Sequence, residues 1–266
     1  MEQDITERWV SGELYESYVG RWSRLVAQAF LRWLEAPAGL AWLDVGCGTG
    51  ALLEAIAESC APERLAGIDP SAGFLDFARW RLGPDRAELR QADARELPFA
   101  TAEFDRVVSG LVLNFVPDPT RAAAEMVRIA RPGGEVALYV WDYAGRMELM
   151  RYFWDAAAAL DRHGGELDEG KRFPLCQPQA LQSLFAAAGL ANVETRPIDV
   201  PTIFRDFDEY WTPFLSGQAP APEYCMSLSA DGRVQLRERL RKTVPSRSDG
   251  SIHLIARAWA IRGHKD

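Results

Sequence analysis

The sequence predicts a doubly wound α/β fold built on a mostly parallel sheet, and three observations support this prediction. Apolar runs of strand length alternate with amphipathic helical segments between residues 41 and 141. A glycine-rich loop follows the first of these runs, and acidic residues follow the next two. Alternation of this kind implies right-handed crossovers and a sheet that helices cover on both faces.

Composition limits the function classes. The chain has 266 residues, 48% of them hydrophobic and 26% charged, and a net charge of −8. The length suits one globular domain with additions, and the acidic balance argues against a nucleic-acid partner. No run of about 20 apolar residues is present, so no membrane span is expected. The four cysteines form no Cys-x-x-Cys pair and the polar start EQDITER is no signal peptide, so we expect a cytoplasmic protein without a metal site.

Residues 1–35 are predicted to form an N-terminal helical cap. Apolar residues recur there at spacings of four, three and four, which places them on one helical face: Trp22, Val26, Ala29 and Trp33. Pro37 and Gly39 end this segment. The rest of the chain, 36–266, is then expected to form the main domain.

Strands and helices alternate next along the chain. The five expected strands are 41–45, 64–68, 87–91, 104–109 and 135–141. Helices are expected at 51–60, at 71–82 and after Asp118-Pro119, where Asp caps free N–H groups and Pro is tolerated in the first turn. The second of these helices is expected to bury one side, formed by Phe74, Phe77, Ala78 and Trp80.

The alternation breaks after residue 142. Helices are expected at 147–160 and at 178–188, the latter stopped by Gly189, and late strands at 193–200 and 251–261. Two stretches, at about 143–177 and 201–249, are expected to be insertions that form a substrate lid.

The second insertion carries two patterns of its own. An aromatic set at spacings of three, four and three predicts one helical face, which forms either the core of the lid or a substrate lining: Phe204, Phe207, Trp211 and Phe214. The basic run 233–242 is expected to be the solvated face of a helix that turns Val234, Leu236 and Leu240 inward.

The loop after the first strand reads Asp44-Val45-Gly46-Cys47-Gly48-Thr49-Gly50. Its glycines permit a tight turn and a close approach of ligand to backbone, and the next helix offers free N–H groups. Gly46-x-Gly48-x-x-Ala51 also fits a dinucleotide site, so an NAD-dependent oxidoreductase is an alternative. Asp44 argues against that alternative, because a carboxylate beside the loop would repel a pyrophosphate and favour a cationic ligand. Asp69 and Asp93 close the next two strands, and three acids at successive strand ends fit a nucleoside without phosphates.

At this point the sequence resembles the class I S-adenosylmethionine-dependent methyltransferases. Five segments follow the order and spacing of that family's motifs: LDVGCGTG (43–50), GIDPS (67–71), QADARELPF (91–99), FDRVVSGLVLNFVPDP (104–119) and RPGG (131–134). The resemblance is greatest to the branch with ubiquinone and menaquinone biosynthesis enzymes and many small-molecule methyltransferases, and it covers about residues 40–142. It implies a Rossmann-like, seven-stranded sheet with the last strand antiparallel, and S-adenosyl-L-methionine as cofactor.

The resemblance also implies roles for residues at the cofactor. The methionine part would lie against Gly46, Cys47 and Gly48, with Asp44 near its amino group. The remaining contacts it implies are Asp69 and Pro70 at the ribose, Asp93 and Ala94 at the adenine, and Ser109, Gly110 and Leu111 along the methionine side. The acids also have simpler possible roles: Asp44 as a cap of the loop, Asp69 as a helix cap and Asp93 as a turn residue.

Residues of the N-terminal cap are candidates for closing over the cofactor. They are Tyr15, Tyr18, Arg21 and Trp22, with Arg21 paired to the cofactor carboxylate. Aromatic rings near a sulfonium are favourable through cation–π attraction. Equally, the aromatic residues fit the packing of a helix, and Arg21 fits a surface position.

Methyl transfer from a sulfonium is an in-line displacement with a good leaving group. The enzyme mainly holds a nucleophile against the methyl carbon and excludes water, so the lack of an obvious catalytic base is no argument against catalysis. Asn114 and His163 are the candidate catalytic residues, although His163 also fits a solvated loop. The candidate substrate residues, which follow the fourth and fifth strands, are Asn114, Trp141, Asp142 and Tyr143.

The expected partner is a small, moderately apolar methyl acceptor, methylated on O, N or C, bound by a monomer or a homodimer. A non-catalytic regulatory protein that binds S-adenosylmethionine is a second alternative. The sequence gives neither the acceptor nor the pathway.

Overall fold

The computed structural model describes residues 20–83, 85–217 and 219–266, and it divides into two compact units. Unit 1 contains the described residues of three segments: 20–22, 142–174 and 199–257. Unit 2 contains those of 23–141, 175–198 and 258–266.

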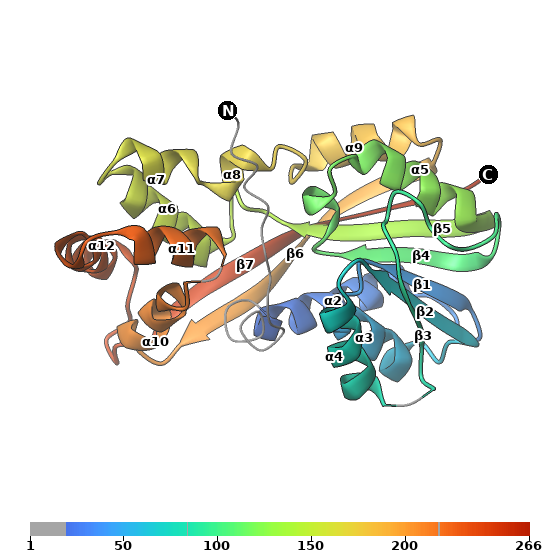
Figure 1. Ribbon diagram of the computed structural model, residues 1–266, viewed down its shortest axis with the longest axis horizontal. Coiled ribbons are helices and arrows are strands. Elements are labelled where there is room, and N and C mark those ends of the chain that lie inside the picture. The colour runs from blue at the N-terminus through green and yellow to red at the C-terminus, as the bar shows by residue number, and fades with distance from the viewer. Residues whose placement is uncertain (1–19, 84, 218) are drawn as a thin grey trace. The chain divides into compact units, whose positions relative to one another are not determined.

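Among the described residues, seven strands form one sheet in the order β3-β2-β1-β4-β5-β7-β6 (Figure 1). Their bounds are β1 Ala41–Val45, β2 Arg64–Asp69, β3 Glu88–Gln91, β4 Phe104–Gly110, β5 Ala130–Trp141, β6 Ala191–Phe204 and β7 Ile252–His264. The pairs β1–β2, β2–β3, β1–β4 and β4–β5 are parallel, whereas β7 is antiparallel to β5. The predicted doubly wound, Rossmann-like sheet with an antiparallel last strand is confirmed.

Strand β1 lies inside the sheet, with other strands on both sides. All five of its residues are buried, and it pairs with β2 on one side and β4 on the other. Val45 aligns with Ile68, and Asp44 aligns with Val108, so the carboxyl ends of the three strands share one edge. Ligands of doubly wound sheets bind outside this edge, where the strand order reverses.

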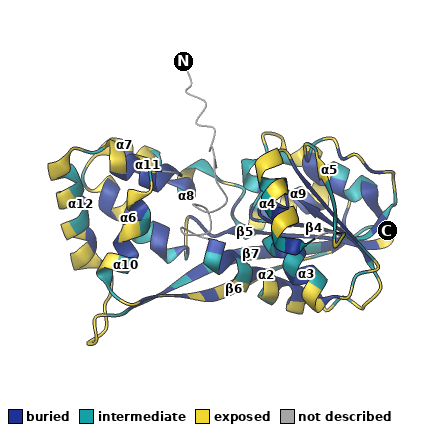
Figure 2. Cartoon of the chain, turned by 60° about the horizontal axis from the view of Figure 1, so that its bottom comes forward, coloured by how far each residue is buried: buried dark blue, intermediate teal, exposed yellow. Residues whose placement is uncertain are grey.

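Helices cover both faces of the sheet within unit 2. Helices α5 Pro119–Ile129 and α9 Pro178–Ala187 lie on one face, and α2 Arg21–Leu34, α3 Ala51–Ser59 and α4 Ala72–Leu82 lie on the other (Figure 1). Figure 2 shows the strands largely buried and the helices with buried and exposed sides. Each helix therefore contributes one apolar side to the core and leaves the other in water.

The predicted start of α5 is observed, but the predicted buried side of α4 is partly wrong. Asp118 accepts a hydrogen bond from the N–H of Arg121 at 3.0 Å, as a helix cap does. Trp80, expected inside, is 77% exposed. Helix α4 buries the stripe Leu75, Ala78 and Leu82 instead, and a residue two positions after Ala78 falls on the opposite side of a helix.

Unit 1 consists mainly of short helices around an aromatic core. Its elements are α6 Glu148–Ala158, α7 Arg162–Glu166, α8 Glu169–Arg172, α10 Phe207–Trp211, the 3₁₀ helix Thr212–Leu215, α11 Pro220–Ser227 and α12 Ala230–Thr243. Helix α6 contacts α7, α11 and α12. In the core, the ring of Phe153 stacks on Phe214 at 4.4 Å, and Tyr210 lies 5.6 Å from Phe214.

Two expectations for this unit need correction. The aromatic set does not form one helical face, because Phe204 ends β6, Phe207 and Trp211 lie on α10, and Phe214 lies on the 3₁₀ helix. Phe204 and Phe214 are fully buried, which fits the core role. On α12, Leu236 and Leu240 are buried as expected, but Val234 is exposed.

No helix in the described parts of the chain is both long enough and apolar enough to cross a membrane.

Candidate cofactor site

The glycine loop between β1 and α3 is built from left-handed backbone. Gly46, Gly48 and Gly50 have φ values of +77°, +51° and +85°, which favour glycine. The N–H groups of Gly46 and Cys47 both donate to the carbonyl of Ile68 at 2.8 Å, which pins the loop to β2. A Cβ at Gly46 would collide with Val112, whereas a Cβ at Gly48 would meet no atom within 4 Å. The loop is thus packed on one side and open at Gly48, where a ligand can approach its backbone.

Asp44 stands directly before this loop and carries a buried carboxylate without a partner. It is 1% exposed, and neither oxygen has a hydrogen-bond partner among the residues that the structure describes. Burial, reinforced by the nearby charge of Asp69, raises the pKa of Asp44 to about 8. Ionising this buried group is costly unless a cation pairs with it, so Asp44 is mostly protonated at pH 7 and a cation beside it would favour its charged form. Asp44 does not cap the loop, because no N–H of the described residues bonds its oxygens.

Asp69, at the end of β2, links the loop to the next helix. Its two oxygens accept hydrogen bonds from the N–H of Gly48 at 2.9 Å and from the N–H of Ser71 at 2.8 Å. Burial raises its pKa, and these two hydrogen bonds oppose the rise. Each carboxylate oxygen has a second lone-pair site, so Asp69 can still accept from ligand hydroxyls. The next residue, Pro70, is exposed.

Asp93, after β3, has a different environment from the other two acids. Its side chain is half-exposed, and Arg95 donates to it from its backbone N–H, Nε and Nη2 at 2.6 to 3.1 Å. The hydrogen bonds from Arg95 lower the pKa of Asp93 to about 2. The structure therefore gives Asp93 the role of a turn residue with its oxygens occupied. Ala94 beside it is buried.

The residues at the end of β4 and directly after it pack closely against their neighbours. Ser109 donates from Oγ to the carbonyl of Val45 at 2.7 Å, which ties β4 to β1 next to the glycine loop. A Cβ at Gly110 would collide with the ring of Tyr139. Leu111 has φ +63°, an uncommon conformation for a non-glycine residue and one that concentrates at functional sites.

Asn114 lies in the 3₁₀ helix Leu113–Phe115 that follows β4. Its Nδ2 is buried and has no hydrogen-bond partner among the described residues. An unpaired buried amide donor is costly, so Asn114 has a donor available for a bound molecule.

Arg21 and Trp22, the described cofactor candidates of the cap, belong to unit 1 and pack there. Nη1 of Arg21 lies 3.1 Å from Glu209, and its guanidinium lies 4.6 Å from the ring of Trp22. Trp22 is buried, with its ring edge-on to Phe204 at 5.5 Å. In the structure Arg21 pairs with Glu209 through Nη1, and its pairing with a cofactor carboxylate stays a prediction. Tyr15 and Tyr18 lie outside the described residues.

The acceptor candidates at the end of β5 and directly after it contact other residues of the protein. Trp141 is buried at the end of β5. Asp142 is buried and accepts a hydrogen bond from the N–H of Arg146 at 2.9 Å, which closes a turn that begins α6. The ring of Tyr143 lies 5.7 Å from Phe173. His163, on α7, is exposed.

A cysteine nucleophile and a bound metal ion are two other groups that can assist a reaction. Cys47 is buried, and burial, with the charges of Asp44 and Asp69, raises the pKa of its thiol well above the usual value. A thiol of this kind is a poor nucleophile. Within the described ranges, no group of three or more His, Cys, Asp or Glu side chains could hold a metal ion.

Comparison with known proteins gives consistent matches. A family model described as "Methyltransferase domain" matches residues 43–138. Demethylmenaquinone methyltransferase of Desulfitobacterium hafniense (strain Y51) is 32% identical over 182 residues, 61% of this chain and 70% of that protein. Phosphatidylethanolamine N-methyltransferase of Cereibacter sphaeroides is 43% identical over 101 residues, which cover 36% of this chain and only 48% of that protein.

Solved structures agree with this fold. Phosphoethanolamine N-methyltransferase 2 of Haemonchus contortus, in complex with S-adenosyl-L-methionine, superposes with a TM-score of 0.59. The identity is 16%, and the alignment covers 95% of this chain and 56% of that chain. At this identity the likeness shows a shared fold.

Proposed function

The chain belongs to the S-adenosylmethionine-dependent methyltransferase family, and on this premise we propose how it holds the methyl donor and which class of acceptor it methylates. The prediction of such an enzyme from five ordered motifs is confirmed. The oxidoreductase alternative, which rested on Gly46-x-Gly48-x-x-Ala51 alone, is set aside.

The observation that carries the proposal is the unpartnered carboxylate of Asp44. S-adenosylmethionine supplies an activated methyl group on a sulfonium, and it also carries an ammonium group. Asp44 holds that ammonium group and gives up its proton in doing so, because neither of its buried oxygens has a hydrogen-bond partner among the described residues. The open side of Gly48 admits the methionine part against the loop backbone.

The nucleoside part is assigned to the ends of β2 and β3. Asp69 accepts from the ribose hydroxyls with the lone pairs that Gly48 and Ser71 leave free. Ala94, buried and apolar, forms part of the adenine wall, whereas Asp93 contributes by shaping its turn. Ser109, Gly110 and Leu111 line the methionine side, where Ser109 keeps β4 in register with β1. Pro70 and Cys47 remain neighbours of the cofactor without a chemical role.

We propose a small, moderately apolar acceptor. The two relatives above are named for a quinone and a phospholipid, which each join a polar reacting group to an apolar body. Asn114 is the strongest acceptor candidate, because its Nδ2 is buried and lacks a partner among the described residues. We propose that Asn114 donates to the polar group of the acceptor and so orients it for displacement.

The other acceptor candidates rest on chain position alone. Trp141 belongs to unit 2, and Asp142 and Tyr143 belong to unit 1, as does the catalytic candidate His163. The inserted segments 143–177 and 201–249 are proposed as the lid that selects the acceptor, since the match to the family model ends at residue 138.

Calorimetric titration with S-adenosylhomocysteine and with NADH tests the cofactor assignment. We expect binding of the first and none of the second, and the reverse would overturn the proposal. Methyl transfer from labelled S-adenosylmethionine to demethylated quinols, phospholipid amines and small phenols then tests the acceptor class. Binding of the cofactor without transfer to any acceptor would favour the non-catalytic alternative.

A further inference from the structure

The loop that joins β3 to β4, residues 92–103, has no regular secondary structure, yet many side chains hold it. This loop carries Asp93 and Ala94, which the proposed function places at the adenine. Leu97 and Phe99 point into the protein, whereas their neighbours Glu96 and Pro98 are exposed. Loops of this kind are usually mobile unless their backbone groups are bonded.

Two side chains of α5, Glu125 and Arg128, bond the backbone in the middle of this loop. Glu125 accepts from the N–H of Leu97 at 2.8 Å, and Arg128 donates from Nη2 to the carbonyl of the same residue at 3.1 Å. Arg128 also donates from Nη1 to the carbonyl of Phe99 at 3.0 Å. Arg128 also donates to Glu125 at 2.7 and 2.8 Å, so the two side chains fix each other. One helix thus satisfies both backbone polar groups of Leu97 with charge-assisted hydrogen bonds.

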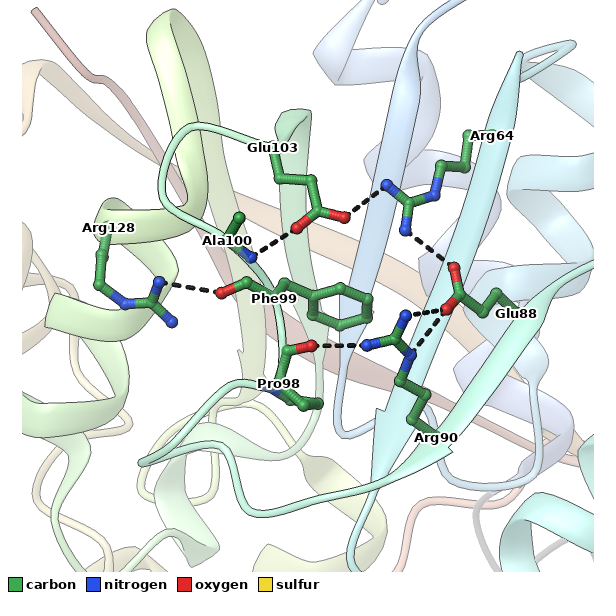
Figure 3. A network of polar contacts seen from close by, with 8 residues as sticks. All are labelled: Arg64, Glu88, Arg90, Pro98, Phe99, Ala100, Glu103 and Arg128. Atoms are coloured by element: carbon green, nitrogen blue, oxygen red, sulfur yellow. Dashed lines mark hydrogen bonds and ion pairs between the residues drawn. The ribbon is translucent and has the colours of Figure 1, made fainter.

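A second set of charged residues holds the same segment from the sheet side (Figure 3). Arg90 of β3 donates to the carbonyl of Pro98 at 2.6 Å, and its guanidinium lies 4.4 Å from the ring of Phe99. Glu103 accepts from the N–H of Ala100 at 2.6 Å. Arg64 links Glu103 to Glu88, and Glu88 bonds Arg90, so these charges form one chain of contacts. Three consecutive residues, 98–100, are therefore held by side chains from outside the segment.

The near end of the loop is fixed to the proposed ribose site. The N–H of Ala92 donates to the carbonyl of Asp69 at 3.2 Å. Arg121 of α5 donates to the carbonyl of Arg95 at 2.9 Å. Asp93 and Ala94 thus lie in a short stretch that is anchored before and behind.

We propose that Glu125 and Arg128 are positioning residues, which hold the 92–103 loop in the shape that receives the adenine. This inference rests on the proposed function, since it takes Ala94 to be part of the adenine wall. A loop that is ordered before binding spares the ligand the entropic cost of ordering it. Neither residue touches the reacting atoms, so their effect is on cofactor affinity and not on the chemical step.

The test compares Arg128→Gln with a matched control, Arg131→Gln. Arg131 lies three residues along the chain and forms a half-exposed ion pair with Asp105 at 2.8 Å. Kd values are measured by calorimetry for S-adenosylhomocysteine and for methylthioadenosine, which contains the adenosine but lacks the amino acid. We expect Arg128→Gln to weaken both ligands by about tenfold and by the same factor, and the control to change either by less than about twofold.

Two further variants separate positioning from general damage. Arg128→Lys keeps a donor for one carbonyl and should recover part of the affinity. Glu125→Gln keeps an acceptor for the N–H of Leu97 but removes the charge that fixes Arg128, so it should reproduce part of the loss, with faster amide hydrogen exchange confined to residues 93–100. If Arg128→Gln is poorly folded, Glu125→Gln carries the test on its own.

Two outcomes would overturn the inference. One is wild-type affinity for both ligands in Arg128→Gln and Glu125→Gln. The other is an equal loss in the Arg131→Gln control. A wild-type protein that binds neither ligand would contradict the proposed function itself, which is a different result.

Discussion

The buried carboxylate of Asp44 in unit 2 differs from the buried carboxylates of unit 1. In unit 1, buried Asp168 accepts two hydrogen bonds from Arg151 at 2.8 and 2.9 Å and one from the N–H of Gly170. Its neighbour Glu169, also buried, accepts from Nε1 of Trp154. In unit 2, Asp44 is as deeply buried and has no hydrogen-bond partner among the described residues.

This difference separates a structural role from a binding role. A buried acid whose acceptor sites are filled by the protein holds segments together, as Asp168 holds α6 to α8. A buried acid left without a partner needs one from outside the chain. Glu135, another buried acid of unit 2, has one unbonded oxygen, but it lies within 3.5 Å of both Arg106 and His264. Among the described residues Asp44 has no comparable partner, and it directly precedes the glycine loop.

The largest expected effect is on the paired acid of unit 1. Asp168→Asn leaves the Arg151 guanidinium with the exposed Asp155 as its charge partner, and loss of one member of a buried pair costs about 3 kcal/mol. We expect the free energy of unfolding to fall by that amount in urea titrations. The control is Asp155→Asn, which removes an exposed hydrogen bond to the same arginine. Equal small effects of the two variants would break the comparison.

The unpaired acid of unit 2 should show the opposite pattern. Asp44→Asn removes the charge that the ligand's ammonium needs, and a hydrogen bond to a charged group contributes about 2 kcal/mol. We expect affinity for S-adenosylhomocysteine to fall about 30-fold without any loss of folding stability. Methylthioadenosine, which has no ammonium group, should bind the variant as it binds the wild type. A variant that is less stable but binds normally would give Asp44 a structural role.

Stability against pH sharpens the contrast further. The pKa of Asp44 is raised from 3.8 to about 8 in the folded protein, so the folded state holds a proton that the unfolded state has lost. The contribution of Asp44 to the free energy of unfolding is therefore greatest below pH 4, declines as the pH rises to about 8, and is constant above. Asp44→Asn should lack this decline, which is measured as the change in the free energy of unfolding between pH 4 and pH 8. Identical pH profiles for variant and wild type would count against the assignment.

The smallest effect is expected at Asp142, the acid of unit 1 that was also an acceptor candidate. Its carboxylate closes a turn with the N–H of Arg146, and an asparagine can still accept that hydrogen bond. Asp142→Asn should therefore lower the free energy of unfolding by about 1 kcal/mol or less and leave cofactor affinity unchanged. Turnover with an identified acceptor is the decisive readout. Lost turnover at normal stability would show that an acid bonded by the protein can also serve the substrate.

The sequence predicted the parallel part of the sheet almost residue by residue. The first strand was placed at 41–45, as observed, and the next four differ from the structure by a few residues at their ends. Glycine, Pro and capping residues mark these boundaries locally, so they can be read without knowing the fold. The positions of Asp44 and Asp69 follow for the same reason, because each stands where a strand ends.

Partners distant in sequence could not be predicted. Arg21 pairs with Glu209, 188 residues away, and Arg128 reaches Leu97 across 31 residues. Nothing local marks Glu125 and Arg128 as residues that hold another loop. Trp80 was placed inside because aromatic residues are often buried, yet the stripe of α4 that meets the core excludes it. The acceptor, the location in the cell and the oligomeric state stay predictions from the sequence.

The most direct test of Asp44 as the unpaired partner of a cationic cofactor is a count of protons released on binding. S-adenosylhomocysteine is titrated at pH 7 in two buffers with different ionisation enthalpies, for the wild type and for Asp44→Asn. Because the pKa of free Asp44 is about 8, pairing it with an ammonium group should release about one proton in the wild type and none in the variant. Binding of equal strength in both proteins, without proton release, would contradict this account of the site.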